Sequence, residues 1–185
     1  SWTLTALPLF VWMGEILFRT KLSENLFKGL APWMSRLPGG LIHVNVVGCA
    51  LFAAISGSSA ATVATVGKMS IPELRKRNYP EKLLLGSLAG SGTLGLLIPP
   101  SIILIIYGVT VQESIAKLFI AGIIPGIMIA IFFMFYVIGW SMLNKNIMPK
   151  MEETFSFSQK IKQSGQLIPV IVLIVAVIGS IYVGI

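Results

Sequence analysis

Charged side chains are scarce in this sequence. They account for 11% of the 185 residues, whereas 55% of the residues are hydrophobic. A soluble globular domain contains about 25% charged residues, so water is a poor solvent for most of this surface. Several apolar runs approach the length of about 20 residues that a helix needs to cross a bilayer core. The composition excludes an ordinary soluble domain and predicts an all-α polytopic membrane protein.

Side chains that commonly carry enzyme chemistry are also few. The chain has one cysteine, Cys49, one histidine, His43, and seven acidic residues, none of which is aspartate. A single thiol forms no intrachain disulfide, and no metal-ligand spacing is present. Because the sequence has no carboxylate pair and no second histidine, general acid–base catalysis has no visible machinery. We therefore expect that the protein is not an enzyme.

Glu15 is the one acidic residue that falls in a predicted membrane segment. An intramembrane carboxylate is a functional candidate by default. Arg19 follows four residues later, however, and this spacing places it to pair with Glu15 on a helix. The pattern favours a structural ion pair over proton coupling.

Basic residues give the chain a net charge of +7, and all but Lys117 fall in three groups, within 19–36, 68–82 and 145–162. Apolar stretches separate the groups, as is typical of cytoplasmic flanks of membrane helices. A nucleic-acid site needs a continuous basic face, so we expect no nucleic-acid partner. A single crossing by 41–67 would put the first two groups on opposite sides. A turn at Ser56–Ser59 keeps thirteen of the fourteen basic residues in the cytoplasm and predicts a re-entrant hairpin.

The hydropathy and charge pattern divides the chain into eight segments. They are the end of a transmembrane helix over 1–18, an amphipathic interfacial helix and loop over 19–40, the re-entrant hairpin over 41–67, a cytoplasmic loop over 68–80, a broken transmembrane helix over 81–109, a transmembrane helix over 117–143, a cytoplasmic loop over 144–164, and the start of another transmembrane helix over 165–185. Both ends of the chain lie in apolar stretches, so we expect an internal part of a longer membrane protein.

Two interruptions of the hydrophobic segments are the candidate site. Irregular backbone at membrane depth survives only where protein buries it or where it lines a cavity. At the tip Ser56–Ser59, exposed carbonyls at the end of one arm suit a cation such as sodium. The N–H groups and hydroxyls at the start of the next arm suit a carboxylate. In Gly90–Ser101, three glycines and the Pro99–Pro100 pair break a helix in its middle, which is the pattern of a transporter midplane site.

Two other interpretations of Gly90–Ser101 are a proline-kinked structural helix and a nucleotide-binding loop. A proline-kinked structural helix explains the prolines alone, but the serine-rich hairpin directly before it favours a binding site. Gly90–Gly95 also matches G-x-G-x-x-G, with Glu113 near the spacing of a ribose-binding acid. That fingerprint requires a preceding strand and an uninterrupted following helix, and Pro99–Pro100 follows almost at once. We therefore reject a nucleotide site.

Five runs of the sequence carry a family resemblance. They are Ser56–Thr62, Met69–Pro72, Gly90–Ser101, Leu118–Gly126 and Ser35–Gly40, and the similarity spans roughly residues 5 to 140. These runs resemble the large membrane subunit of the tripartite ATP-independent periplasmic (TRAP) transporters. The run Gly-Ser-Gly-Thr-Leu-Gly-x-x-Ile-Pro-Pro-Ser over 90–101 is its most specific part.

The resemblance implies a fold and a function. Such subunits resemble members of the ion-transporter superfamily, with two inverted repeats that each hold a re-entrant hairpin and a discontinuous transmembrane helix. This chain resembles the first repeat. The implied activity is sodium-coupled import of an organic acid, of the C4-dicarboxylate or sialic-acid type, through the bacterial inner membrane by an elevator-type movement. The implied partners are a periplasmic binding protein, a small four-helix membrane subunit (separate or fused) and the lipid bilayer.

The resemblance also assigns roles to residues at the two interruptions. The implied sodium ligands, acting largely through carbonyls, are Ser56, Ser58, Ser59, Gly92 and Thr93. The residues implied to face substrate are Ser58, Ser59, Pro99, Pro100 and Ser101. No basic residue lies within either interruption, so the sequence does not select the acid.

Two alternatives remain open at this point. One is a sodium/carboxylate symporter of the same superfamily that needs no binding protein. The other is a non-transporting membrane scaffold subunit, for which the hairpin tip would tolerate substitution.

Overall fold

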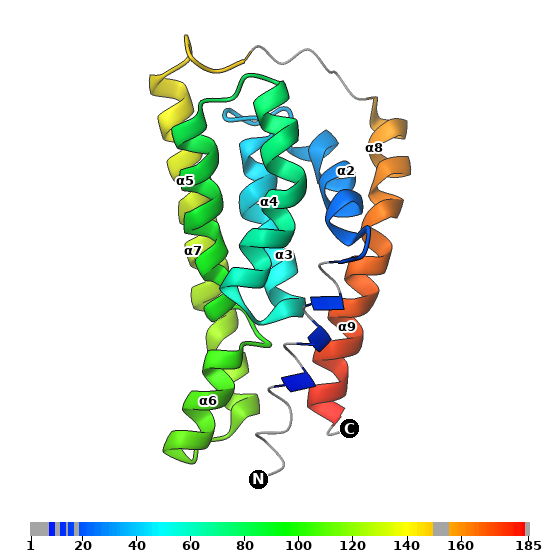
Figure 1. Ribbon diagram of the computed structural model, residues 1–185, viewed down its shortest axis with the longest axis vertical. Helices are drawn as coiled ribbons and strands as arrows, with labels where there is room; N and C mark the ends of the chain where they lie inside the picture. The colour runs from blue at the N-terminus through cyan, green and yellow to red at the C-terminus, as the bar shows by residue number, and fades with distance from the viewer. Residues whose placement is uncertain (1–7, 10–11, 14, 17–18, 150–155, 184–185) are drawn as a thin grey trace.

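The computed structural model describes residues 8–9, 12–13, 15–16, 19–149 and 156–183. All regular secondary structure in this part of the chain is helical (Figure 1). The elements are α2 (Leu22–Met34), α3 (Ile42–Ser56), α4 (Ser59–Lys76), α5 (Glu81–Gly92), η1 (Thr93–Leu96), α6 (Ile102–Val111), α7 (Ile115–Leu143), α8 (Phe157–Ser164), η2 (Gly165–Leu167) and α9 (Ile168–Val183). The expected helix over 1–18 lies mostly outside the described residues.

Helix α3 forms the centre of the bundle. It contacts α2, α4, α5, α7 and α9, and Figure 1 shows it enclosed between α5 and α7 on one side and α2 and α9 on the other. Most of its side chains are buried, and Ile42, Phe52 and Ile55 are fully buried. A helix that is apolar around its whole circumference is stable only when other apolar groups surround it, so α3 forms the core around which the other helices pack.

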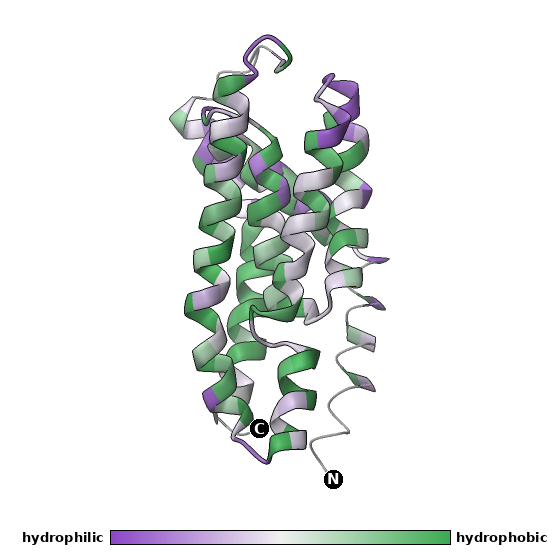
Figure 2. Cartoon of the chain, turned by 90° about the vertical axis from the view of Figure 1, so that its left-hand side faces the viewer, coloured by the Kyte–Doolittle hydropathy of each residue, from purple (hydrophilic) through white to green (hydrophobic). Residues whose placement is uncertain are grey.

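The outer surface of the bundle is largely apolar. Ile124, Phe132 and Phe135 on α7 are more than half exposed. In Figure 2 hydrophobic residues cover the middle of the molecule, and hydrophilic residues gather toward its two ends. Helix α7 and the stretch 157–180 are each long and apolar enough to span a membrane. This distribution matches an apolar solvent around the middle of the bundle.

Two packed helices, α3 and α4, form a helical hairpin where the sequence predicts a re-entrant one. Figure 1 shows its turn about midway along the bundle, well short of the far end of α7. The second arm is longer than expected, because α4 continues to Lys76 and includes Pro72. The stretch 68–80, expected as a loop, is therefore mostly helical. An exposed helical extension with paired charges, such as Glu73 with Arg77 at 2.8 Å, has no strong signal in hydropathy.

The expected broken helix is also present. Helix α5 ends at Gly92, η1 continues for one tight turn, and the backbone is irregular from Leu97 until α6 begins at Ile102. Pro99 and Pro100 occupy the irregular part, where their missing N–H groups cost no helical hydrogen bond. The break thus coincides with the residues that the sequence identifies as helix-breaking.

Helix α2 and the α8–η2 segment pack against each other. We expected α2 to lie on the membrane surface, but Leu22, Leu26, Phe27 and Leu30 are buried by protein. The expected loop 144–164 contains α8, which begins at a capping box formed by Ser156 and Gln159. The α8–η2 segment packs against α2. Hydropathy alone does not distinguish an apolar stripe that faces lipid from one that faces a neighbouring helix.

One expected ion pair is confirmed near the beginning of the described chain. The Arg19 guanidinium lies 2.9 Å from the Glu15 carboxylate, and both side chains are largely exposed. The pairing favours a structural role for Glu15, as its spacing from Arg19 predicts.

Candidate functional site

The hairpin turns over two residues, Gly57 and Ser58. Gly57 has φ of +61°, in the left-handed region that glycine adopts without steric cost. Ser58 is extended and caps α4, because its hydroxyl accepts a 3.4 Å hydrogen bond from the Ala61 N–H. Glycine after a helix end and serine before a helix start are the preferred residues at those positions. The local sequence therefore specifies the turn.

A buried pair of hydroxyls closes the inside of this turn. Ser56 Oγ and Thr62 Oγ1 lie 2.9 Å apart, and both residues are fully buried. Ser56 Oγ is also 3.4 Å from the backbone of Ser58. A buried hydroxyl without a partner costs about 1–3 kcal/mol, so each member of this pair satisfies the other. In this structure the Ser56 side chain holds the turn in shape.

The tip lies directly against the break in the α5–α6 segment. The Ile102 N–H donates a 3.2 Å hydrogen bond to the Gly57 carbonyl. A Cβ atom on Gly57 would lie 2.7 Å from the Pro100 carbonyl oxygen. A Cβ atom on Gly95 would lie 2.8 Å from Ser58 C and from Ser59 N. These distances are shorter than any ordinary Cβ contact, so the two backbones meet only because both positions are glycine.

Glycines on α5 and α7 bring further helices to the same junction. A Cβ on Gly92 would lie 2.0 Å from Val63 Cγ2 of the hairpin. On α7, a Cβ on Gly122 would lie 2.7 Å from the Leu97 carbonyl oxygen, and one on Gly126 would lie 2.8 Å from Ile98 Cγ1. Small residues that allow close backbone approach are the common means of helix packing in membranes. The hairpin and α7 thus hold the irregular segment from two sides.

The residues predicted as site residues are placed in three ways. Ser58 and Ser59 are half-buried at the tip, and Gly92 lies against the first turn of α4. Pro99, Pro100 and Ser101 are buried, and the Ser101 hydroxyl donates a 2.7 Å bond to the Leu96 carbonyl. Thr93 is exposed, and its hydroxyl donates a 2.7 Å bond to Gly90 of the preceding turn. The junction therefore gathers the tip, Gly92 and the proline turn, while the Thr93 hydroxyl serves its own helix.

Among these predicted residues, only Ser59 has a buried hydroxyl without a hydrogen-bond partner in the described part of the chain. Among the described residues, no three His, Cys, Asp or Glu side chains cluster as they would around a metal ion, so any cation at the turn would be held by carbonyl and hydroxyl oxygens. Neutral oxygen donors are the ligands that hard cations prefer. The donor set is compatible with sodium, and Ser59 Oγ is its best-placed side-chain member.

A second polar cluster, which the sequence pattern did not predict, lies between α3 and α5. The Asn45 amide donates to the Ser87 hydroxyl at 3.0 Å and to the Leu84 carbonyl at 3.3 Å. The Ser91 hydroxyl donates to the Asn45 carbonyl at 3.3 Å. Asn45 is fully buried, and its Oδ1 has no partner. Asn45, as a polar residue within the apolar run 42–55, is the sequence feature that could have indicated this cluster.

The geometry defines a class of protein, a helical membrane protein with a hairpin tip packed against a discontinuous helix. The family comparison agrees with it over the whole chain. Residues 1–185 match the family described as "Tripartite ATP-independent periplasmic transporter, DctM component". The chain belongs to this family of membrane permeases.

Several curated relatives carry names from the same family. The chain is 33% identical over 183 residues to the C4-dicarboxylate TRAP transporter large permease protein DctM of Pseudomonas aeruginosa, covering 99% of this chain and 42% of that protein. It is 33% identical over 183 residues to the ectoine/5-hydroxyectoine large permease UehC of Ruegeria pomeroyi, covering 99% and 42%. It is 38% identical over 131 residues to the sialic acid permease SiaT of Haemophilus influenzae, covering 71% and 21%. The chain spans about two-fifths of the length of the first of these relatives.

Proposed function

We propose that this chain supplies one half of the transport site in a sodium-coupled secondary importer of an organic acid. The observation that carries the proposal is the junction between the Ser56–Ser59 tip and the break before Ile102, about midway along an apolar bundle. Broken helices of transporters place their ends at such a midplane site. Family membership adds the class of transport, and two of the relatives are named for C4-dicarboxylates and sialic acid.

The ion in this proposal is sodium, held by oxygen atoms around the tip. The proposed ligands are Ser56, Ser58, Ser59, Gly92 and Thr93. Ser59 has the strongest support, because its buried hydroxyl has no hydrogen-bond partner among the described residues. Ser56 and Thr93 bond elsewhere through their hydroxyls, so their contribution would come through carbonyl oxygens. A cation bound here also interacts favourably with the carbonyl end of α3.

The substrate in this proposal is a carboxylate that faces the start of α4. The proposed contacts are Ser58, Ser59, Pro99, Pro100 and Ser101. The first turn of α4 presents N–H groups with partial positive charge, which attract an anion. Ser101 supports the site indirectly, since its buried hydroxyl fixes the proline turn through the Leu96 carbonyl. A second inverted repeat in the remainder of the protein would complete the pocket.

The proposed assembly is a multi-pass complex in the bacterial inner membrane. A periplasmic binding protein would deliver the acid, and a small four-helix membrane subunit, separate or fused, would hold the scaffold against which the site moves as an elevator. The apolar exterior of α7 and the buried junction support this assignment, because a site enclosed by rigid packing is suited to rigid-body movement.

Uptake by the full-length assembly in vesicles tests the proposal. Labelled C4-dicarboxylates, sialic acid and ectoine are supplied with and without an inward sodium gradient, and with and without the binding protein. We expect uptake of one acid only when both are present. Uptake that ignores the sodium gradient would exclude the proposed coupling. Uptake that needs no binding protein would identify a simple symporter instead.

Substitutions at the tip connect this test to the structure. Replacing Ser58 or Thr93 by a bulky residue should abolish sodium-driven uptake. Ser59→Ala should raise the half-saturating sodium concentration about tenfold, the effect of losing one hydrogen-bonding contact to a charged group. Ser180→Ala, on the exposed face of α9, is the matched control. Normal uptake by the Ser58, Ser59 and Thr93 variants would instead indicate a scaffold subunit.

A further inference from the structure

Two cavities lie one above the other along the end of α7 that carries Leu143. The first has a volume of about 390 Å³ and lies among the Arg36–Gly40 loop, Tyr79, the last turn of α7 and the residues that follow it. The second has a volume of about 300 Å³ and is lined by α3, α5 and α7, with Phe132, Phe133 and Tyr136 as its aromatic wall. The proposed transport function uses neither cavity.

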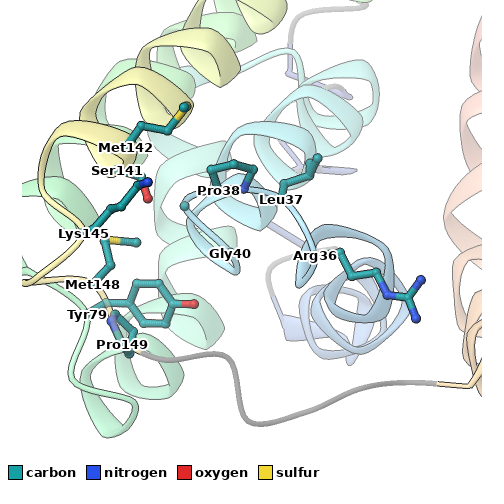
Figure 3. Close-up of a pocket in the computed structure, with 11 residues that line it drawn as sticks. Arg36, Leu37, Pro38, Gly40, Tyr79, Ser141, Met142, Lys145, Met148 and Pro149 are labelled. Atoms are coloured by element: carbon teal, nitrogen blue, oxygen red, sulfur yellow. The ribbon is translucent and has the colours of Figure 1, made fainter.

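The first cavity has basic side chains on a largely apolar lining. Lys145 and Arg36 line it, and no acidic residue is among its lining residues. Figure 3 shows the side chains of Lys145 and Ser141 directed toward the Pro38–Gly40 loop, while Arg36 extends outward from the rim. No salt bridge found within the described residues involves Lys145 or Arg36. Within the described part of the chain, the positive charge of the cavity therefore has no counter-ion.

Tyr79 adds a hydrogen-bond donor to the first cavity. Its hydroxyl accepts a 3.1 Å hydrogen bond from the Leu41 N–H, which leaves its own O–H free to donate toward the cavity. Burial raises the pKa of Tyr79 above its usual value, so the hydroxyl keeps its proton at neutral pH. A lysine ammonium beside a neutral hydroxyl is a donor set suited to a phosphate oxygen.

The second cavity lies beside the first, toward the apolar part of the bundle, and Val137 packs between them. Val137, which lines it, also lies against the loop of the first cavity, since a Cβ on Gly39 would be 2.6 Å from Val137 Cγ1. On an α-helix, positions 133, 137 and 141 lie on one face, at a rise of about 6 Å per four residues. At Gly86, a Cβ would meet nothing within 4 Å. The apolar groove is therefore open at Gly86.

The two cavities lie in parts of the bundle that differ in polarity. Hydrophilic residues gather at the end where the chain connects α4 to α5 and leaves α7, and the bundle below is hydrophobic (Figure 2). The basic cavity lies at the polar end, and the aromatic groove lies in the apolar part. A basic pocket followed by an apolar, aromatic-lined groove has the polarity of one phospholipid, with its headgroup in the pocket and an acyl chain in the groove.

We propose that an anionic phospholipid binds here, with its phosphate at Lys145 and Tyr79 and an acyl chain along Phe132, Phe133 and Tyr136. Basic pockets between transmembrane helices on the cytoplasmic side are suited to anionic headgroups. The lipid fills the gap between α5 and α7 and neutralises Lys145.

Native mass spectrometry of the delipidated full-length assembly tests this proposal. Phosphatidylglycerol and phosphatidylcholine are added at equal concentrations, and bound lipid is counted. We expect phosphatidylglycerol to bind in preference. Lys145→Gln should reduce that preference about fivefold, the contribution of one cation near an anionic headgroup, and Lys145→Arg should restore it. Lys117→Gln, at the opposite end of α7, should have no effect.

A second pair of variants tests the acyl groove. Gly86→Leu should reduce binding of both lipids severalfold, because the new side chain occupies the groove. Gly139→Leu is the matched control, since a Cβ there also meets nothing within 4 Å. Melting temperatures verify that each variant is folded. Equal binding of the two lipids, or a Gly86→Leu variant that binds normally, would overturn the proposal. Displacement of phosphatidylglycerol by an equal concentration of glycerol 3-phosphate would assign the basic cavity to a soluble phosphate and overturn the lipid assignment.

Discussion

Two junctions in this molecule join segments far apart in sequence, and they are built in opposite ways. At the hairpin tip, backbone meets backbone, and Gly57 and Gly95 provide the space. At the α2–α8 junction, side chains make the contact: Trp33 Nε1 donates to Ser164 Oγ at 2.8 Å, and Lys160 Nζ lies 5.4 Å from the centre of the Trp33 ring. At the hairpin tip, Gly57 and Gly95 have no side-chain atom that could be removed. Almost no space remains there for an added Cβ atom.

The difference indicates where precision is needed. A contact between side chains can adjust its rotamers, so it tolerates conservative substitution at a modest cost in stability. A contact between two backbones moves only as a unit, and any displacement changes the positions of the carbonyl and N–H groups that we propose as contacts for the ion and the substrate. We therefore expect that tip variants impair transport and that α2–α8 variants change stability alone.

Gly95→Ala should have the largest effect. Its methyl group would lie 2.8 Å from Ser58 C and Ser59 N, and these backbone atoms cannot yield independently. We expect uptake below about one-hundredth of wild type, as a 1 Å displacement at a reacting site reduces rate about 100-fold. Vesicle uptake measures it. Gly139→Ala, where the methyl group enters open space, should retain normal uptake; equal activity of the two variants would contradict the close contact.

Gly57→Ala should have the next largest effect, for two separable reasons. The left-handed backbone costs an L-residue about 1–2 kcal/mol, and the new Cβ would lie 2.7 Å from the Pro100 carbonyl oxygen. Asparagine tolerates the left-handed region, as at Asn78 with φ of +58°. Gly57→Asn should therefore recover part of the melting temperature but not the uptake. Full recovery of uptake would mean that backbone strain alone explains the glycine.

Substitutions in the Ser56–Thr62 pair should have effects of intermediate size on the free energy of unfolding. The effects of the two substitutions should be strongly coupled. Ser56→Ala or Thr62→Val alone leaves a buried hydroxyl without its partner and should cost about 1–3 kcal/mol. The double variant removes both groups and should cost less than the sum of the single variants. Denaturant unfolding in detergent gives the four free energies of this cycle. Additive costs would show that the 2.9 Å contact does not stabilise the turn.

Trp33→Phe should have the smallest effect. It removes the bond to Ser164 and weakens the interaction with Lys160, which together are worth about 1 kcal/mol at a partly exposed site. Thermal unfolding should detect a small shift while vesicle uptake is unchanged. Ser164→Ala should lower the melting temperature by a similar amount, without adding to Trp33→Phe. Reduced uptake by either variant would show that the two junctions are not independent.

Much of the site was predictable because its signals are local. The turn needs glycine at position 57 and a cap at position 58, and the break needs prolines at 99 and 100. Charge distribution then favoured a hairpin over a single crossing. Asn45 and the burial of α2 were not predictable, because both depend on which helix faces which. The length of α4 was underestimated, since Glu73–Arg77 pairing stabilises a helix that hydropathy does not reveal.

The sequence by itself determined the helical class, the two interruptions and the family of this protein, because helix periodicity, chain breakers and apolar length act over a few neighbouring residues. Only the tertiary structure decided that Gly57 and Gly95 serve one junction, that Ser59 rather than Thr93 has an unpartnered buried hydroxyl, and that Lys145 lies above an apolar groove. These properties arise from contacts between segments separated by tens of residues. No local pattern encodes such distances; they are set when the helices pack around α3.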